Sequence, residues 1–321
     1  MKKLTQKCKG ILFRYTLIVL LLFTAINSIA QLYPHEGYIN VKGGKVWYRI
    51  VGSGSNTPLI LLHGGPGATS YYLNPLAPLS KDRPVIFLDQ LGCGRSSRIT
   101  DTTLMTIDNY VEELAQLKKA LGIKDYYLYG HSWGTMLGID YYLKHPEGIK
   151  AIIFGSPVFS TDLWIKDADT LIKSLPDSIQ QVININEQNH TYSSPDYKRA
   201  VAIYYNHFLN RNETHSNDMD SLDKTFGTNI YEYMWGPSEF KATGTLKNYD
   251  RLQVLQNIKV PVLLMCGEYD EARPATVRYY QSLIPGADFI LIKNAGHDTM
   301  IDNVQDNNAA IEDFLKKMDT N

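Results

Sequence analysis

A serine between two glycines, in the run Gly130-His131-Ser132-Trp133-Gly134, carries the strongest chemical signal in this sequence of 321 residues. The aromatic run 125–129 before it is typical of a buried strand, and the apolar residues of 136–143 after it recur at helical spacing. A sharp turn between a strand and a helix strains the serine backbone and projects the hydroxyl from the edge of a sheet. Glycine on either side lets neighbouring backbone pass without a Cβ clash. The pattern predicts that Ser132 is a nucleophile, and the alternative is a glycine-rich turn that holds an ordinary serine.

A serine nucleophile needs a base, and the base needs a group that orients it. Two downstream loops supply candidates, because each directly follows a predicted strand and should lie at the same sheet edge as Ser132. His297 is the expected general base and then general acid, and Asp270 is the expected carboxylate that orients it. Glu268, in the same loop as Asp270, is the competing carboxylate.

An acyl-transfer site also needs backbone N–H groups that face the developing oxyanion. One should come from Trp133, the residue after the nucleophile. The other should come from the glycine-rich loop 63–67, which follows a predicted buried strand. Pro66 has no N–H, so Gly65 is the expected donor, with Gly64 as the alternative.

The elements that must position these residues alternate between strands and helices. Apolar runs predict eight strands, at 38–41, 45–51, 58–62, 84–88, 125–129, 151–154, 261–266 and 288–292. Helical periodicity is clearest at 106–121 and 303–317. This alternation predicts an α/β fold with a mostly parallel, eight-stranded sheet and helices on both faces.

The alternation stops between residues 157 and 250, where the sequence is polar and rich in Tyr, Asn and Asp. Helical stretches at 161–175 and 196–209 and the lack of a buried-strand pattern predict a helical cap over the sheet edge. The predicted division is a signal segment at 1–30, a core domain at 31–156 and 251–321, and a cap at 157–250.

The N-terminal segment has the pattern of a secretory signal. Basic residues precede the apolar run 15–26, and Ser28 and Ala30 provide the small residues before a cleavage site. We therefore expect an exported, periplasmic or secreted protein without a stable membrane segment after cleavage, and the alternative is an uncleaved membrane anchor. Export permits a disulfide, but Cys93 and Cys266 are expected to be buried and unpaired.

Composition excludes some partners. The net charge is −1, which gives no indication of a nucleic acid or an anionic membrane as partner. No Cys/His spacing indicates zinc, and neither a metal nor another cofactor is expected. The sequence does not indicate an oligomeric state.

Three motifs carry a resemblance to a known family. His-Gly-Gly-Pro-Gly at 63–67, Asp-Gln-x-Gly-x-Gly-x-Ser at 89–96 and Gly-His-Ser-Trp-Gly at 130–134 resemble the proline iminopeptidases, which are α/β-hydrolases of peptidase family S33. The segments 236–240 and 267–271 are most similar to the tricorn-interacting aminopeptidases of that family.

The resemblance implies an α/β-hydrolase core with a helical cap, and a serine aminopeptidase that releases N-terminal residues, often proline, through an acyl-enzyme. It implies that Glu239 and Glu271 bind the free α-amino group of a short peptide. An ammonium removed from water requires paired negative charge, which agrees with this role. Trp235, Tyr204, Tyr205 and Phe208 are candidates either for apolar walls around a proline ring or for cap core. One departure is the export signal, since the family members are mostly cytosolic.

Two other functions remain open at this point. The fold does not fix the substrate, so an esterase, lactonase or amidase acting on a non-peptide substrate is the alternative enzyme. A non-catalytic binding module is the alternative from another class, although it would not require a complete set of Ser132, Asp270 and His297.

Overall fold

A computed structural model describes residues 35–212 and 216–320. The chain divides into two compact units, Met1–His35 and Glu36–Asn321, and the second contains every element described below. The predicted signal segment 1–30 lies outside the described residues. In the described part of the chain, no helix has the length and apolar character needed to span a membrane.

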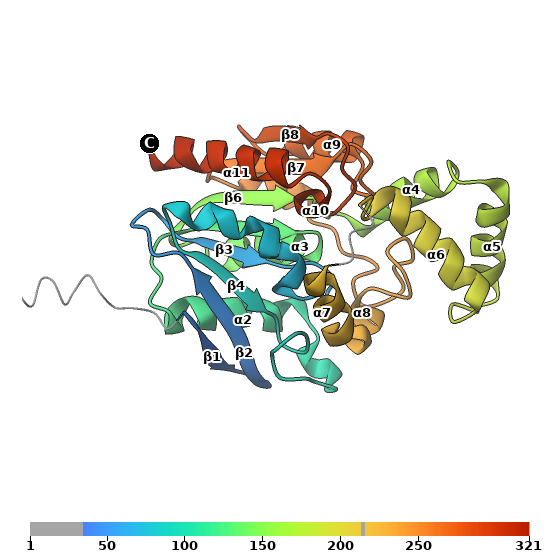
Figure 1. The fold of residues 1–321 in the computed structure, drawn as a ribbon, viewed down its shortest axis with the longest axis horizontal. Coiled ribbons are helices and arrows are strands. Elements are labelled where there is room, and N and C mark those ends of the chain that lie inside the picture. Colours follow the sequence, from blue (N-terminus) through green and yellow to red (C-terminus); the bar gives the residue numbers. More distant parts are fainter. Residues whose placement is uncertain (1–34, 213–215, 321) are drawn as a thin grey trace, which may run out of the picture. The chain divides into compact units, whose positions relative to one another are not determined.

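The core of Glu36–Asn321 is one sheet with strand order β1-β2-β4-β3-β5-β6-β7-β8 (Figure 1). The first two strands run antiparallel to their neighbours, and the others pair in parallel. The strands span Glu36–Val41 (β1), Gly44–Val51 (β2), Leu59–Leu62 (β3), Val85–Asp89 (β4), Tyr126–His131 (β5), Ile149–Gly155 (β6), Val262–Gly267 (β7) and Asp288–Ile292 (β8). Strands β3, β4, β5 and β7 are buried throughout, as their apolar sequences require in a sheet covered on both faces. The predicted mostly parallel sheet of eight strands is confirmed.

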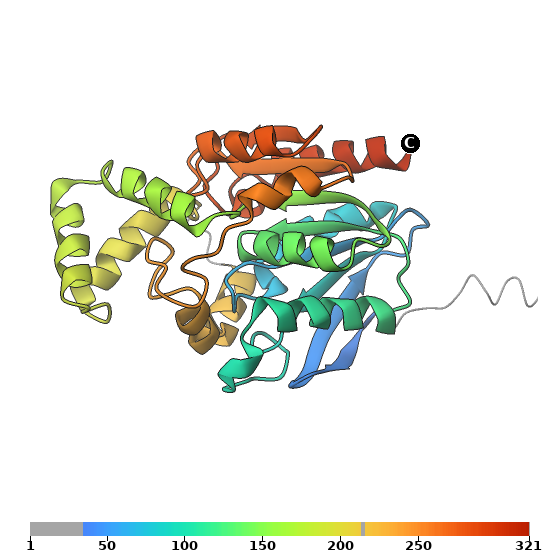
Figure 2. The same cartoon turned by 180° about the vertical axis from the view of Figure 1, so that it is seen from behind.

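Helices cover both faces of this sheet. Helices α2 (Ile107–Ala120), α3 (Trp133–Lys144) and α9 (Pro274–Leu283) lie on the face toward the viewer in Figure 2. The 3₁₀ segment η1 (Ser70–Lys81) and α11 (Val304–Asp319) lie on the other face, where apolar side chains of both pack against the strands. The short segments are η2 (Thr102–Leu104), η3 (Leu252–Asn257) and α10 (Thr299–Asp302). The helices predicted at 106–121 and 303–317 are confirmed to within two residues at each end.

A helical segment lies between β6 and β7, where the sequence predicts a cap. Its helices are α4 (Thr161–Ile172), α5 (Asp177–Gln188), α6 (Pro195–Phe208), α7 (Asn217–Thr225) and α8 (Thr228–Met234). Helices α4, α5 and α6 extend away from the sheet in Figure 1, and Tyr197, Tyr204 and Phe208 of α6 belong to a separate apolar core there. The end of α6 is tied to the loop after β8, because the amides of His297 and Asp298 donate to the carbonyls of Phe208 and Leu209. The cap therefore contributes directly to the position of the loop that holds His297.

Cys93 and Cys266 are both buried and unpaired, as the sequence predicts. Burial raises the pKa of both thiols well above the ordinary value, so both remain protonated.

Candidate active site

Ser132 sits on the sharp turn between β5 and α3. Its backbone has φ 54° and ψ −122°, a left-handed conformation that costs free energy in a residue with a Cβ atom. A Cβ on Gly130 would collide with the carbonyl oxygen of Gly134, and a Cβ on Gly134 would collide with that of Leu62. Both glycines are therefore required by packing, and the serine side chain is left at the surface of a cavity with the residue only 7% exposed.

Asp270 and His297 meet at the ends of β7 and β8. Their contact joins Asp270 Oδ1 to His297 Nδ1 at 2.8 Å. The same carboxylate accepts hydrogen bonds from the amides of Gly267 and Ala272, which fix its orientation. Glu268 instead faces the surface and accepts from the amide of Asn294, so it does not compete with Asp270 for the imidazole.

The other ring nitrogen of His297 is buried and has no hydrogen-bond partner within the described residues. No hydrogen bond joins it to the Ser132 hydroxyl, and the nearest carboxylate oxygen, Glu271 Oε1, is 4.0 Å away. Such contacts often tighten only when substrate binds. Burial lowers the pKa of His297, but the charge and hydrogen bond of Asp270, followed by the charge of Glu271, raise it to about 10. A pKa raised in this way favours the imidazolium over the neutral base.

The loop after β3 lies against Ser132. A Cβ on Gly64 would come within 3.1 Å of Ser132 Cβ. The Gly64 amide donates to the Tyr72 hydroxyl at 2.7 Å, so it is already engaged. In the described part of the chain, the amides of Gly65 and Trp133 make no such bond, and Trp133 opens α3, where N–H groups are free and the helix dipole favours negative charge. Gly65 also has φ 110°, which favours glycine.

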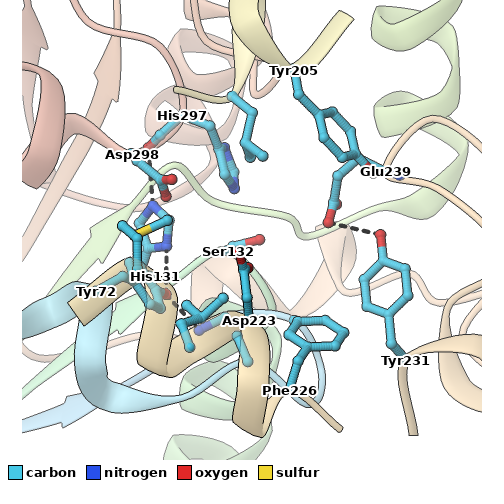
Figure 3. A pocket seen from close by; sticks show the side chains of 16 residues that line it. Tyr72, His131, Ser132, Tyr205, Asp223, Phe226, Tyr231, Glu239, His297 and Asp298 are labelled. Atoms are coloured by element: carbon cyan, nitrogen blue, oxygen red, sulfur yellow. Dashed lines mark hydrogen bonds between the residues drawn. The ribbon is translucent and has the colours of Figure 1, made fainter. Parts of the chain in front are cut away.

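A cavity of about 380 Å³ opens over these groups (Figure 3). Ser132 and His297 contribute its reactive wall, while Glu239 and Tyr231 enter from the cap. The Tyr231 hydroxyl donates to Glu239 Oε1 at 2.7 Å. Burial raises the pKa of Glu239, although that hydrogen bond and the charge of His297 oppose the rise. A carboxyl held in this way gains from any cation that enters the cavity.

Glu271 is 1% exposed, with Oε1 4.0 Å from Nε2 of His297, and it is not part of the cavity wall. Both of its carboxyl oxygens are buried, and neither has a hydrogen-bond partner in the described part of the chain. Burial raises its pKa well above the ordinary value; the charge of His297 lowers it, and that of Glu239 raises it further. Such an unsatisfied carboxyl is costly in a folded protein, and it is a feature typical of sites that bind a ligand.

The prediction that Trp235 lines the substrate site needs a correction. Trp235 is 3% exposed and is not part of the cavity wall. Its Nε1 donates toward the carbonyls of Ser238 and Glu239, at 3.1 and 3.2 Å, and its ring meets Trp164 edge to face. The indole therefore fixes the backbone of Glu239 by hydrogen bonding and does not contact the cavity. Of the aromatic candidates, Tyr205 lines the cavity, whereas Tyr204 and Phe208 belong to the cap core.

Ser156 is a site residue that the sequence did not reveal. It is fully buried after β6, with φ 49°, and its Oγ lies 2.7 Å from Asp270 Oδ2 and 2.9 Å from the His297 carbonyl oxygen. Its hydroxyl can donate to either acceptor and so fixes the Asp270–His297 pair. No local motif marks this serine, because its partners are 114 and 141 residues away.

His131 and Tyr72 form a second arrangement that sequence reasoning missed. Nδ1 of His131 is 2.9 Å from the Tyr72 hydroxyl, and Nε2 is 3.0 Å from the His297 carbonyl oxygen. Burial and the charge of His297 lower the pKa of His131 well below its ordinary value, so it is neutral. The histidine thus connects the glycine loop, through Tyr72, to the loop that holds His297. In the sequence, the one signal for a role of His131 was its position next to Ser132 in the motif.

Together, the sheet order, the serine on the turn after β5 and the Asp270–His297 pair after β7 and β8 define a serine hydrolase of the α/β-hydrolase class. A family model described as "alpha/beta hydrolase fold" matches residues 57–304.

The chain is 43% identical over 285 residues to a proline iminopeptidase of Heyndrickxia coagulans, a match that covers 88% of this chain and 99% of that protein. Among solved structures, it is similar to VinJ, with a TM-score of 0.85, 29% identity and coverage of 88% and 98%. It is also similar to a proline iminopeptidase of Mycobacterium smegmatis, with a TM-score of 0.81, 30% identity and coverage of 89% and 99%. The chain belongs to the proline iminopeptidase family, and the resemblance seen in the sequence is confirmed.

Proposed function

We propose that this protein is a serine aminopeptidase that releases the N-terminal residue, proline above all, from short peptides through an acyl-enzyme intermediate. The observation that carries the proposal is the pair of buried carboxyls, Glu239 and Glu271, beside the serine and the imidazole. The name shared by the relatives supports the choice of an N-terminal proline over other acyl groups.

In the proposed reaction, Ser132 Oγ attacks the carbonyl carbon of the first residue while His297 Nε2 takes the hydroxyl proton. Asp270 holds the imidazole through Nδ1 and stabilises its positive charge. The amides of Gly65 and Trp133 donate to the oxyanion. His297 then gives the proton to the leaving amine, and a water activated by the same imidazole hydrolyses the ester on Ser132.

The glutamates would fix which bond is cut. An ammonium in this cavity loses its hydration and needs negative partners in compensation. Glu239 would supply one from the cavity wall and Glu271 the other from beside His297 Nε2, so the first carbonyl is the one that would reach Ser132. Chain ends would be accepted and internal peptide bonds refused. An N-terminal proline suits a pair of carboxylates, because its secondary ammonium has two N–H donors.

Binding of that ammonium would also prepare the base. Before a substrate binds, Glu271 would help to hold His297 as the imidazolium, which cannot accept the serine proton. A substrate ammonium placed on Glu271 and Glu239 cancels this effect and lowers the pKa of His297. The free amine would therefore contribute to the chemical step as well as to binding.

Export is part of the proposal. The basic, apolar and small-residue pattern of residues 1–30 supports secretion with cleavage after Ala30, so that the substrates are peptides outside the cytoplasm. Mass analysis of the mature N-terminus in the producing cell tests this, and an intact Met1 would contradict it.

The catalytic assignment is tested by Ser132→Ala with prolyl and alanyl arylamides as substrates. Turnover should fall by roughly 10⁴-fold or more, because the nucleophile is removed. Thermal unfolding should show that the variant is still folded, since alanine keeps the Cβ and fits the same turn. Retained turnover in a folded variant would contradict the mechanism.

A further inference from the structure

Asp298 is a carboxyl of the cavity that the proposed mechanism does not use. It directly follows His297, precedes α10 and is 8% exposed. No hydrogen bond or ion pair engages its carboxyl within the described residues, although its backbone amide donates to the Leu209 carbonyl. It lines the cavity and is directed into it (Figure 3). The residue is nine-tenths buried, and a carboxyl that faces a cavity without a protein partner is available to a cation that enters it.

The position of Asp298 in the cavity indicates which residue of a bound peptide it would contact. In Figure 3, Ser132 lies between Asp298 and Glu239. If Glu239 holds the ammonium of the first residue, the scissile carbonyl lies at Ser132 and the peptide continues away from Glu239. The second residue then lies on the side of Asp298. The charge of Asp298 contributes to the raised pKa of the Tyr72 phenol, second to burial, which places it near the glycine loop on this same side.

The surroundings of Asp298 suit a long cationic side chain. Leu209, Met219 and Leu222 contribute apolar surface to the cavity wall, against which an alkyl stem can pack while its charged end reaches a carboxylate. Among the described residues that line the cavity, none is lysine or arginine, so His297 is the cationic group closest to Asp298 in sequence, and it makes no ion pair with that carboxyl.

We propose that Asp298 forms a subsite for the second residue of the peptide and selects lysine or arginine there. This inference rests on the proposed aminopeptidase function, because it takes the direction of the peptide from the ammonium site.

Several titratable groups surround Asp298, and they give the subsite a pH dependence. Burial raises the pKa of Asp298 to about 7, the charge of His297 from the same loop opposes the rise, and Asp302 of α10 adds to it. Asp270 after β7 and Glu239 of the cap add further negative charge, while the nearby His131 is neutral. Since only the ionised carboxylate attracts a cation, the preference for lysine should grow as the pH rises through 7.

The test compares the dipeptide amides Pro-Lys-NH₂, Pro-norleucine-NH₂ and Pro-Glu-NH₂ at pH 8. Norleucine has nearly the length and apolar stem of lysine without its charge, so the lysine-to-norleucine ratio of kcat/KM isolates the charge. The wild type should prefer lysine by about tenfold, as a charge-assisted hydrogen bond in a partly dry site gives. Asp298→Asn, which keeps the side-chain shape, should bring the ratio to within about twofold and should relieve the discrimination against glutamate.

Asp223→Asn is the matched control, because Asp223 lines the same cavity from α7 but is exposed. It should leave the lysine preference in place. A ratio near one in the wild type, or a preference lost in Asp223→Asn and kept in Asp298→Asn, would overturn the proposal. Prolyl arylamide has no second residue, so it tests the aminopeptidase function without the subsite. If the wild type fails to cleave it, the proposed function fails. If it is cleaved while lysine and norleucine peptides react equally, only the subsite fails.

Discussion

Glu271→Gln should change two reactions of the same enzyme in opposite directions. Glutamine keeps the size of the side chain but removes the charge beside His297 Nε2, 4.0 Å from Oε1. For a prolyl arylamide, the loss of one of two buried partners of the ammonium costs about 3 kcal/mol, which is roughly a hundredfold in kcat/KM. p-Nitrophenyl acetate has no ammonium, so its hydrolysis does not bear the cost of losing this partner.

The ester should in fact react faster in the variant at pH 7. Glu271 is among the groups that raise the pKa of His297 to about 10, so its neutralisation lowers that pKa and increases the fraction of free base. The acid limb of the pH–rate profile for ester hydrolysis should therefore move to lower pH. The assay is the full pH profile of kcat/KM for both substrates in the wild type and in the variant.

Glu268→Gln is the matched control for this comparison. The substitution is the same and lies in the same loop, but Glu268 faces the surface and accepts from the Asn294 amide. Both reactions should stay within about twofold of the wild type, as for a surface change. The reasoning is refuted if Glu271→Gln lowers both reactions by the same factor, or if the acid limb of the ester profile stays in place.

Two further changes test groups that support the site and the core. Ser156→Ala removes the hydroxyl 2.7 Å from Asp270 Oδ2, so prolyl arylamide turnover should fall about tenfold with a smaller change in KM; an unchanged kcat with a raised KM would contradict this positioning role. Glu113→Gln acts on stability: burial raises the pKa of Glu113 from 4.5 to about 8, so the folded state binds the proton more tightly than the unfolded chain does. This stability is fully present below pH 4.5 and is lost as the pH rises to 8, by up to about 5 kcal/mol. Chemical denaturation should therefore find the glutamine variant similar to the wild type near pH 4.5 and more stable at pH 8, and a parallel pH dependence of the two proteins would exclude this explanation.

The sheet and the loops of the site were predictable because strong local signals determine them. Apolar runs specify buried strands, and parallel connections bring the carboxyl ends of β5, β7 and β8 to one edge. Ser132 directly follows β5, and Asp270 and His297 lie in the loops that follow β7 and β8, so their common edge follows from topology. The glycines around Ser132 are also a dependable sequence signal, because packing allows no Cβ at either position.

Contacts between distant segments were not predictable from the residues alone. Ser156 contacts Asp270 across 114 positions in the sequence. No residue pattern around it predicts that its backbone has a positive φ. Trp235 was placed on the substrate wall because tryptophan suits an apolar pocket, but a carbonyl acceptor in the cap turns its indole inward. Glu239 was found only through the family resemblance, because nothing local separates it from a solvated glutamate. The signal segment and the domain division remain predictions.

The pair of carboxyls would make this serine hydrolase an aminopeptidase rather than an esterase. The most direct measurement is kcat/KM of the wild type for L-prolyl arylamide and for N-acetyl-L-prolyl arylamide, under the same conditions. The two substrates share the scissile bond and differ at the ammonium that Glu239 and Glu271 would bind. We expect the free amine to react at least about 10³-fold faster, since an acetyl group leaves both carboxyls unpaired and also loses the effect on His297. Equal or faster cleavage of the acetylated substrate would show that the two carboxyls do not bind the substrate ammonium.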